Sequence, residues 1–206
     1  MPGLQEQPCW IEGACRLEGR LGLAPGAAGG LVVAHPHPLY GGSMTNNVVE
    51  ALVEAGAEAG LATLRFNFRG VGSSVGACDE GKGCGEDLLA ALGYLAGLGT
   101  ERLVVAGYSF GAWVAGRTDL ASQGAADQIW VAPPMGMLPF DPVLASPAPS
   151  LILAGGRDEF CPAAELTALV QGLKPPPCLK RLEEADHFFR GQEDWIREQV
   201  KVHLSR

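Results

Sequence analysis

The chain lacks the features of a protein that binds nucleic acid or crosses a membrane. Lysine and arginine together number 15 against 23 aspartate and glutamate residues, which gives a net charge of −8. Without a basic run, this balance argues against a nucleic-acid partner and against an anionic-membrane surface. The uncharged apolar stretch at residues 88–100 is too short to span a bilayer. We therefore expect neither a nucleic-acid nor a membrane partner.

Paired cysteine motifs and a targeting signal are also missing. The six cysteines include no Cys-x-x-Cys pair, and residues 1–13 have neither the positive nor the apolar region of a secretory signal. These absences predict reduced thiols in a cytoplasmic protein. Cys78 and Cys84 share a glycine-rich loop and could pair under oxidation, which the sequence leaves open.

The composition that remains is that of a globular domain. Of 206 residues, 47% are hydrophobic and 18% are charged, so the chain can bury a sizeable core. No repeat, linker or change of composition divides the chain. We expect a single domain over residues 1–206.

Short apolar runs alternate with segments of helical length. The runs are typical of strands buried on both faces and lie at residues 31–34, 61–67, 102–107, 128–132, 150–155 and 179–183. Helices are predicted at residues 44–59, 86–98, 163–173 and 193–204. Residues 11–21 alternate between apolar and polar, which predicts an antiparallel edge hairpin.

This order predicts an α/β fold. Strands that alternate with helices favour a three-layer α/β/α sandwich around a mainly parallel sheet of about seven or eight strands. On the first helix, Glu50, Glu54 and Glu58 stand four residues apart, and we expect this stripe to be a solvated face.

Residues 107–111, Gly-Tyr-Ser-Phe-Gly, are the most informative segment for chemistry. The segment follows a predicted strand and opens a run of small residues. In this setting a serine sits on a strained turn with its hydroxyl exposed, and the glycines let neighbouring backbones approach. Ser109 is therefore the candidate nucleophile. An ordinary glycine-rich turn is the alternative.

A serine nucleophile needs a general base, and the chain has four histidines. His203 lies in the predicted last helical turn, where a solvated or dipole-capping role is expected. His35 and His37 precede Ser109 and alternate with prolines. His187 follows the last predicted strand, at the edge where the sites of parallel sheets assemble. His187 is therefore the candidate base.

Asp158 is the candidate acid that orients the imidazole of His187. It follows the strand at residues 150–155. Glu159 could substitute for it, and Asp186 is a weaker alternative. The order serine, aspartate, histidine is the chain order expected of α/β-hydrolases.

Backbone N–H groups must also stabilise the oxyanion of an acyl-transfer reaction. Phe110, the residue after the nucleophile, is expected to supply one. The second should come from the loop at residues 35–42, whose prolines have no N–H. His37, Leu39 or Tyr40 could supply it, and we favour His37.

Four segments together resemble the small cap-less bacterial hydrolases related to dienelactone hydrolase, within the α/β-hydrolase superfamily. They are HPHPLYGGSMTNNVV at 35–49, RFNFRGVGSS at 65–74, GYSFGA at 107–112 and DHFF at 186–189. The resemblance runs over roughly residues 10–205. It implies Ser109, Asp158 and His187 as a catalytic triad with esterase-like activity. Dienelactone hydrolase itself uses a cysteine nucleophile, from which Ser109 departs.

The proline-rich segment at residues 133–149 is too short for a helical lid, in the place where this fold usually carries a cap domain. We therefore expect an open site that favours small acyl esters. The predicted function is a serine carboxylesterase, or a thioesterase, that works through an acyl-enzyme. An acyltransferase or peptidase on the same triad, and a non-catalytic binding protein of the same fold, are the alternatives.

Neither a metal nor an organic cofactor is implied. His35 and His37 could form a two-histidine metal site, but no third ligand has suitable spacing. Residues 65–70 should shape the loop that lines the site, although Arg69 could instead meet a substrate carboxylate. A small-molecule ester is the expected partner. The natural substrate and the choice between monomer and homodimer stay open.

Overall fold

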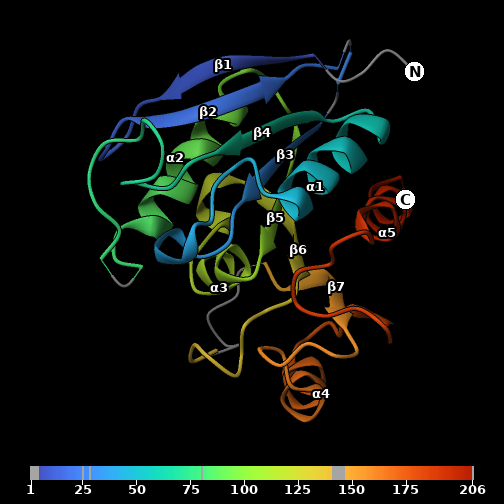
Figure 1. The fold of residues 1–206 in the computed structure, drawn as a ribbon. Helices are drawn as coiled ribbons and strands as arrows, with labels where there is room; N and C mark the ends of the chain where they lie inside the picture. Colours follow the sequence, from blue (N-terminus) through green and yellow to red (C-terminus); the bar gives the residue numbers. More distant parts are fainter. Residues whose placement is uncertain (1–4, 25, 28, 80, 141–146, 206) are drawn as a thin grey trace.

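The computed structural model describes residues 5–24, 26–27, 29–79, 81–140 and 147–205 (Figure 1). Within these residues one sheet has the strand order β1-β2-β4-β3-β5-β6-β7-β8. The strands are β1 Glu6–Ile11, β2 Leu17–Gly22, β3 Gly29–Ala34, β4 Ala62–Phe66, β5 Arg102–Tyr108, β6 Ala125–Val131, β7 Pro149–Gly155 and β8 Cys178–Leu182. The pairs β1–β2 and β2–β4 are antiparallel and all others are parallel. The predicted mainly parallel sheet with an antiparallel edge hairpin is confirmed.

Helices cover both faces of the sheet (Figure 1). They are α1 Asn47–Glu58, α2 Cys84–Ala96, α3 Phe110–Gly116, α4 Ala163–Gly172 and α5 Glu193–Leu204, with 3-10 turns at Pro38–Tyr40 and Ala121–Gln123. Side chains along β3 alternate between the two faces, because successive strand residues point in opposite directions. Leu31 packs with α1 and α5, and Val32 packs with α2 and α3. The predicted three-layer sandwich is confirmed.

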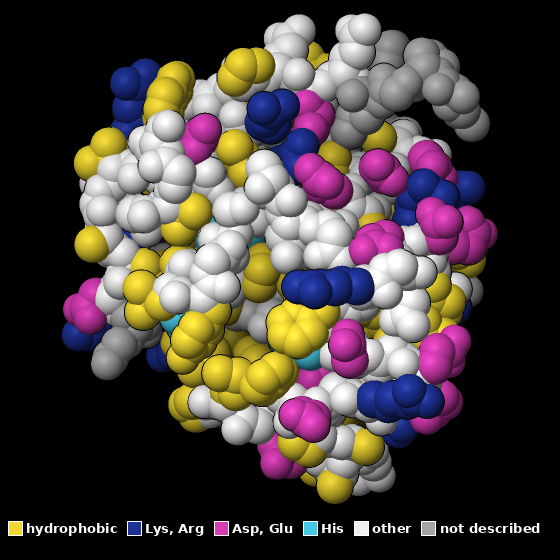
Figure 2. All heavy atoms as spheres, in the orientation of Figure 1, with side chains coloured by type: hydrophobic (Ala, Val, Ile, Leu, Met, Phe, Trp, Pro, Cys, Tyr) yellow, Lys and Arg dark blue, Asp and Glu magenta, His cyan; other side chains and the backbone are white. Residues whose placement is uncertain are grey.

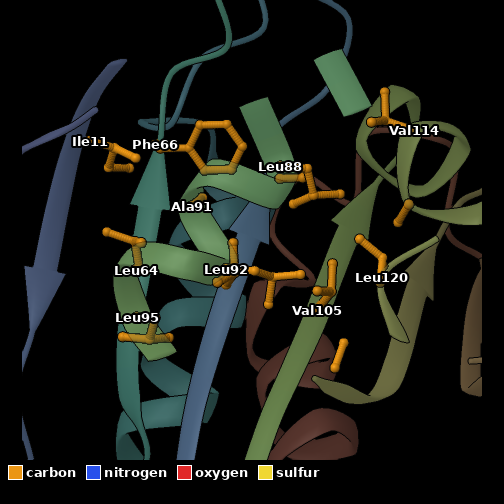
Figure 3. Close-up of a cluster of buried hydrophobic side chains, with 14 of the residues drawn as sticks. Ile11, Leu64, Phe66, Leu88, Ala91, Leu92, Leu95, Val105, Val114 and Leu120 are labelled. Carbon is orange, nitrogen blue, oxygen red and sulfur yellow. The ribbon is translucent and has the colours of Figure 1, made fainter. Parts of the chain in front are cut away.

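One side of α2 supplies much of the core on its face of the sheet. Leu88, Ala91, Leu92 and Leu95 recur at helical spacing, and all four are fully buried. Figure 3 shows these side chains pointing toward Leu64 and Phe66 of β4 and Val105 of β5. This packing holds the strands whose carboxyl ends carry the loops described below.

Two helices begin at residues other than those predicted. α1 begins at Asn47, because the side chain of Asn46 accepts a hydrogen bond from the Val48 N–H and caps the helix. Met44, the predicted start, lies in the preceding loop. α2 begins at Cys84, two residues before the predicted start, directly after Gly83, whose φ is 75°.

The glutamate stripe on α1 is exposed, as predicted, and its members also form surface ion pairs. Arg197 of α5 lies 3.2 Å from Glu54 and 3.7 Å from Glu58. Glu50 lies 2.9 Å from the guanidinium of Arg65 on β4. These ion pairs connect α1 to β4 and to α5.

The segment after β6 contains turns but no α-helix in its described part, and residues 141–146 lie outside the described residues. No described helix is both long and apolar enough to cross a bilayer. All six cysteines are free thiols. The Cys78 and Cys84 sulfur atoms lie 3.8 Å apart without a bond between them.

Arg65 is a buried cation that connects three elements. Its guanidinium lies 2.6 Å from Glu6 of β1 and also donates to the Met44 carbonyl at 2.9 Å. We expect Arg65→Ala to lower the free energy of unfolding by about 3 kcal/mol, because it leaves the shielded Glu6 charge unpaired. Arg197→Ala, which breaks more exposed pairs, should cost less than about 1 kcal/mol. Urea denaturation of both variants measures the difference, and equal losses would contradict it.

Candidate active site

Ser109 occupies a strained turn between β5 and α3. Its φ is 53° and its ψ is −114°, a conformation that non-glycine residues seldom adopt. A Cβ atom on Gly107 would overlap the backbone of Ala112, and one on Gly111 would overlap the carbonyl of Ala34. Residues 107–111 thus form the strained strand–turn–helix segment that the sequence predicts. Glycine is required on both sides because the backbones touch.

Ser109, His187 and Asp158 form a hydrogen-bonded line. The Ser109 Oγ lies 2.9 Å from His187 Nε2, and His187 Nδ1 lies 2.8 Å from Asp158 Oδ2. All three residues are buried, with 6–8% of their surface exposed. The other carboxylate oxygen of Asp158 accepts the N–H groups of Phe160 and Cys161 at 2.9 and 3.0 Å. The structure therefore brings together the three side chains that the sequence singled out.

The two alternative acids lie elsewhere. Glu159 is exposed. Asp186 accepts the Phe188 N–H at 2.8 Å, a local turn bond within the histidine loop. The carboxylate that contacts the His187 ring is that of Asp158.

The loops that carry Asp158 and His187 lie backbone against backbone. The Gly156 N–H donates to the Leu182 carbonyl at 2.8 Å, and the Arg157 N–H donates to the Ala185 carbonyl at 2.9 Å. A Cβ atom on Gly156 would stand only 2.5 Å from the carbonyl oxygen of Glu183. This close approach lets a short aspartate side chain reach the imidazole.

The loop after β3 leaves one N–H group available beside Ser109. The Leu39 N–H donates to the His37 ring at 3.2 Å, and the Tyr40 N–H donates to the His37 carbonyl at 3.1 Å. In the described part of the chain, no acceptor contacts the His37 N–H. The Phe110 N–H stands in the first turn of α3, where no intrahelical acceptor exists. The His37 and Phe110 rings lie 4.6 Å apart.

The segment at residues 65–70 holds the loop that precedes α1, as predicted. Asn67 accepts the Met44 N–H at 2.8 Å, while Arg65 donates to the carbonyl of the same residue. Arg69 does not face the pocket, so the alternative of a substrate-binding role is wrong. Its guanidinium contacts the buried Asp87 at 2.7 Å.

His35 is a structural residue whose ring nitrogens are both engaged. Its Nδ1–H donates to the Pro36 carbonyl at 2.6 Å, and its Nε2 accepts the Phe68 N–H at 3.0 Å. Burial lowers the pKa of His35 to about 4, so the ring stays neutral. This arrangement leaves no nitrogen for a metal ion. Among the described residues, no group of three or more His, Cys, Asp or Glu is placed to hold one.

His203 lies in the last turn of α5, as predicted, but it is shielded and not solvated. Its Nε2 lies 2.6 Å from Ser150 Oγ and 3.4 Å from Asp127 Oδ2. The last turn of α5 packs over the start of β7, which shields the ring from water. His203 thus ties α5 to the sheet, far along the strands from Ser109.

A pocket of about 550 Å³ opens above Ser109. Apolar and aromatic side chains dominate its wall, which includes Tyr40, Phe110, Pro134, Met137, Leu138, Phe160 and Phe188. Among the described residues that line the pocket, Arg190 is the one with a cationic side chain. Figure 2 shows hydrophobic side chains gathered around a hollow on this face of the molecule. Tyr40, Met137 and Phe188 are 75%, 48% and 47% exposed, so the mouth is an open apolar rim.

Two further polar residues near the site were missed by sequence reasoning. The Tyr108 hydroxyl donates to the His187 carbonyl at 2.9 Å, and Asn47 Nδ2 donates to the Phe188 carbonyl at 3.2 Å. Tyr108 occupies a variable position of the Gly-x-Ser-x-Gly pattern, so the pattern does not indicate a role for this residue. Asn47 lies within the segment at 35–49 that carries the family resemblance, but its partner is 141 residues away.

Known proteins of the same architecture share sequence with the whole chain. No family model matches the chain. It is similar to an α/β serine hydrolase homologue from Coxiella burnetii, with 34% sequence identity and a TM-score of 0.87. The similarity covers 99% of this chain and 100% of that one. An α/β serine hydrolase without a lid from Xanthomonas campestris is 31% identical over 96% of this chain and 93% of that one, with a TM-score of 0.87. The uncharacterized protein RP471 of Rickettsia prowazekii is 33% identical over 201 residues, covering 92% of this chain and 84% of that protein.

Together with the strand order and the strained serine turn, these similarities show that the chain belongs to the α/β-hydrolase superfamily. The predicted α/β-hydrolase fold is confirmed. The described part of residues 133–149 holds no helical cap, and the similar protein from Xanthomonas campestris is a hydrolase without a lid.

The buried His35 makes stability depend on pH. Its pKa falls from 6.5 to about 4 on folding, so between these values the unfolded chain binds more protons than the native state. Stability should therefore fall by up to about 3 kcal/mol as the pH drops from 6.5 to 4. His35→Gln, which keeps an acceptor for the Phe68 N–H, should lose much of this slope. Urea titrations of both proteins at several pH values measure it, and parallel slopes would refute the assignment.

Proposed function

We propose that this protein is a serine carboxylesterase that cleaves small acyl esters or thioesters through an acyl-enzyme. The observation that carries the proposal is the buried line from Asp158 through His187 to Ser109, directly beneath an open apolar pocket. In this proposal Ser109 is the nucleophile, His187 the general base and Asp158 the residue that orients the imidazole.

The first half-reaction forms the acyl-enzyme. Ser109 Oγ attacks the carbonyl carbon while its proton passes to His187 Nε2, with which it already shares a 2.9 Å hydrogen bond. Asp158 accepts from Nδ1–H and stabilises the imidazolium that forms. His187 then gives the proton to the leaving alcohol or thiol. The ester C–O or thioester C–S bond breaks, and the acyl group stays on Ser109.

The second half-reaction uses water in place of the serine. His187 takes a proton from water as the water oxygen attacks the acyl carbon. The bond between the acyl carbon and Ser109 Oγ then breaks, His187 returns the proton to Oγ, and the carboxylic acid leaves. An open pocket gives water direct access to this step, which favours hydrolysis over transfer to a second acceptor.

The oxyanion of both tetrahedral intermediates needs two donors. The N–H groups of Phe110 and His37 are suited to this role, because neither is used by a helix or a turn. The hydrogen bonds of Leu39 and Tyr40 within their own loop favour His37 over these two alternatives. Backbone donors are rigid, so they need no reorganisation when negative charge develops on the substrate oxygen.

The first test labels the purified protein with a fluorophosphonate probe, which needs only an activated serine. We expect the wild type to be labelled, and Ser109→Ala and His187→Ala to lose labelling. Ester hydrolysis should fall by about 10⁴-fold or more in each variant, because the triad works as a unit. If all three proteins fold yet none is labelled, a non-catalytic binding protein becomes the better interpretation.

A chain-length series of acyl esters tests the substrate class. Each buried methylene contributes about 0.8 kcal/mol, but methylenes beyond an open rim stay in water and add nothing. We expect kcat/KM for C2–C4 esters to equal or exceed that for C12 esters. A clear preference for C12 would contradict the small-acyl proposal. Amide cleavage that exceeds ester cleavage, or a product that depends on an added acceptor, would instead identify a peptidase or an acyltransferase.

A further inference from the structure

Two consecutive carbonyl groups of the histidine loop are each held by a side chain from a different element. The His187 carbonyl accepts the buried hydroxyl of Tyr108, the last residue of β5, at 2.9 Å. The Phe188 carbonyl accepts the amide of Asn47, the first residue of α1, at 3.2 Å. The loop is thereby fixed both by the strand that precedes Ser109 and by α1, which packs beside α5.

We propose that Tyr108 and Asn47 are positioning residues that set the His187 imidazole at hydrogen-bond distance from Ser109. The proposal rests on the proposed function, because it assigns these residues a role in proton transfer at that serine. Neither residue exchanges a proton with substrate. Each acts through the backbone on which the imidazole is carried.

Tyr108 is adjacent in sequence to the nucleophile and in space to the base. It is 2% exposed, and its ring centroid lies 5.7 Å from that of His187. Burial raises the pKa of Tyr108, so at neutral pH the hydroxyl is protonated and can donate. One side chain therefore links the turn of Ser109 to the backbone of His187.

Asn47 reaches the loop and the helix that follows it with the same nitrogen. Its Nδ2 also donates to Glu193 Oε1, in the first turn of α5, at 2.7 Å. Burial raises the pKa of Glu193, but hydrogen bonds from Asn47 and from nearby backbone N–H groups outweigh this and lower it. Glu193 thus stays a carboxylate. Because both partners are acceptors, the amide is held with its nitrogen toward the loop.

The loop needs such anchors because its backbone is strained two residues after His187. Phe189 has a φ of 50°, and its fully buried ring stacks on Trp195 at 6.2 Å. A non-glycine residue in this region persists only where its surroundings hold it. A small rotation of the loop would move the imidazole away from Ser109. Misplacement by about 1 Å can cost about a hundredfold in rate.

The test compares Tyr108→Phe and Asn47→Ala with matched controls far from the site. Tyr94→Phe removes a hydroxyl on α2, and Gln199→Ala removes an amide that binds Lys180. We expect kcat to fall about tenfold in the first two variants with KM changed less than about twofold, and both controls to match the wild type. A kcat that falls only in proportion to the folded fraction, measured by thermal melting, would make the residues merely structural and overturn the proposal.

Proton NMR supplies a readout that does not require turnover. The Nδ1–H of His187, bonded to Asp158, should give a downfield resonance that is absent in His187→Ala. We expect this resonance to shift or broaden in Tyr108→Phe and Asn47→Ala but not in Tyr94→Phe. If the wild type is neither labelled by the fluorophosphonate probe nor active, but the two variants show these shifts, the esterase function is rejected and the positioning role is kept. An active wild type with unchanged kcat and resonance in both variants would reject the positioning role alone.

Discussion

A positive φ at Ser109 is possible only because three stretches of backbone touch around it. Gly107 lies against the start of α3, and Gly111 lies against the carbonyl of Ala34 at the end of β3. The second contact matters beyond the turn itself, since Ala34 immediately precedes the loop that carries His37. The same close approach that strains the serine therefore brings the start of α3 against the end of β3, and the Phe110 and His37 rings lie 4.6 Å apart.

Close backbone contacts also position the other side of the site. Gly155 and Gly156 let the loop after β7 lie on the loop after β8, and this contact brings Asp158 to the imidazole. The hydroxyl of Tyr108 connects β5 to the histidine loop by its hydrogen bond to the His187 carbonyl. The geometry of the candidate site thus depends on backbone contacts more than on side-chain reach, and a rigid scaffold of parallel strands positions the loops that make these contacts.

Local pattern was enough to predict most of the elements and the three side chains of the hydrogen-bonded line. Buried parallel strands appear as continuous apolar runs, and the Gly-x-Ser-x-Gly segment constrains its own backbone, so both are visible in short windows. The errors share one cause. His203 and Arg69 both have partners distant in sequence, and their environment depends on which element packs beside them.

The class of fold, the strained serine turn and the order of the candidate nucleophile, acid and base are all predictable from the amino-acid sequence. These follow from chain-local physics: periodic burial, the conformational freedom of glycine and the missing N–H of proline. Three features become visible only in the folded chain. They are the N–H groups that stay free in the described loop after β3, the buried and hydrogen-bonded ring of His35, and the hydrogen bonds from Tyr108 and Asn47 to the histidine loop. Those outcomes depend on hydrogen bonds between residues up to 141 positions apart, which form only when packed helices and strands bring their partners together.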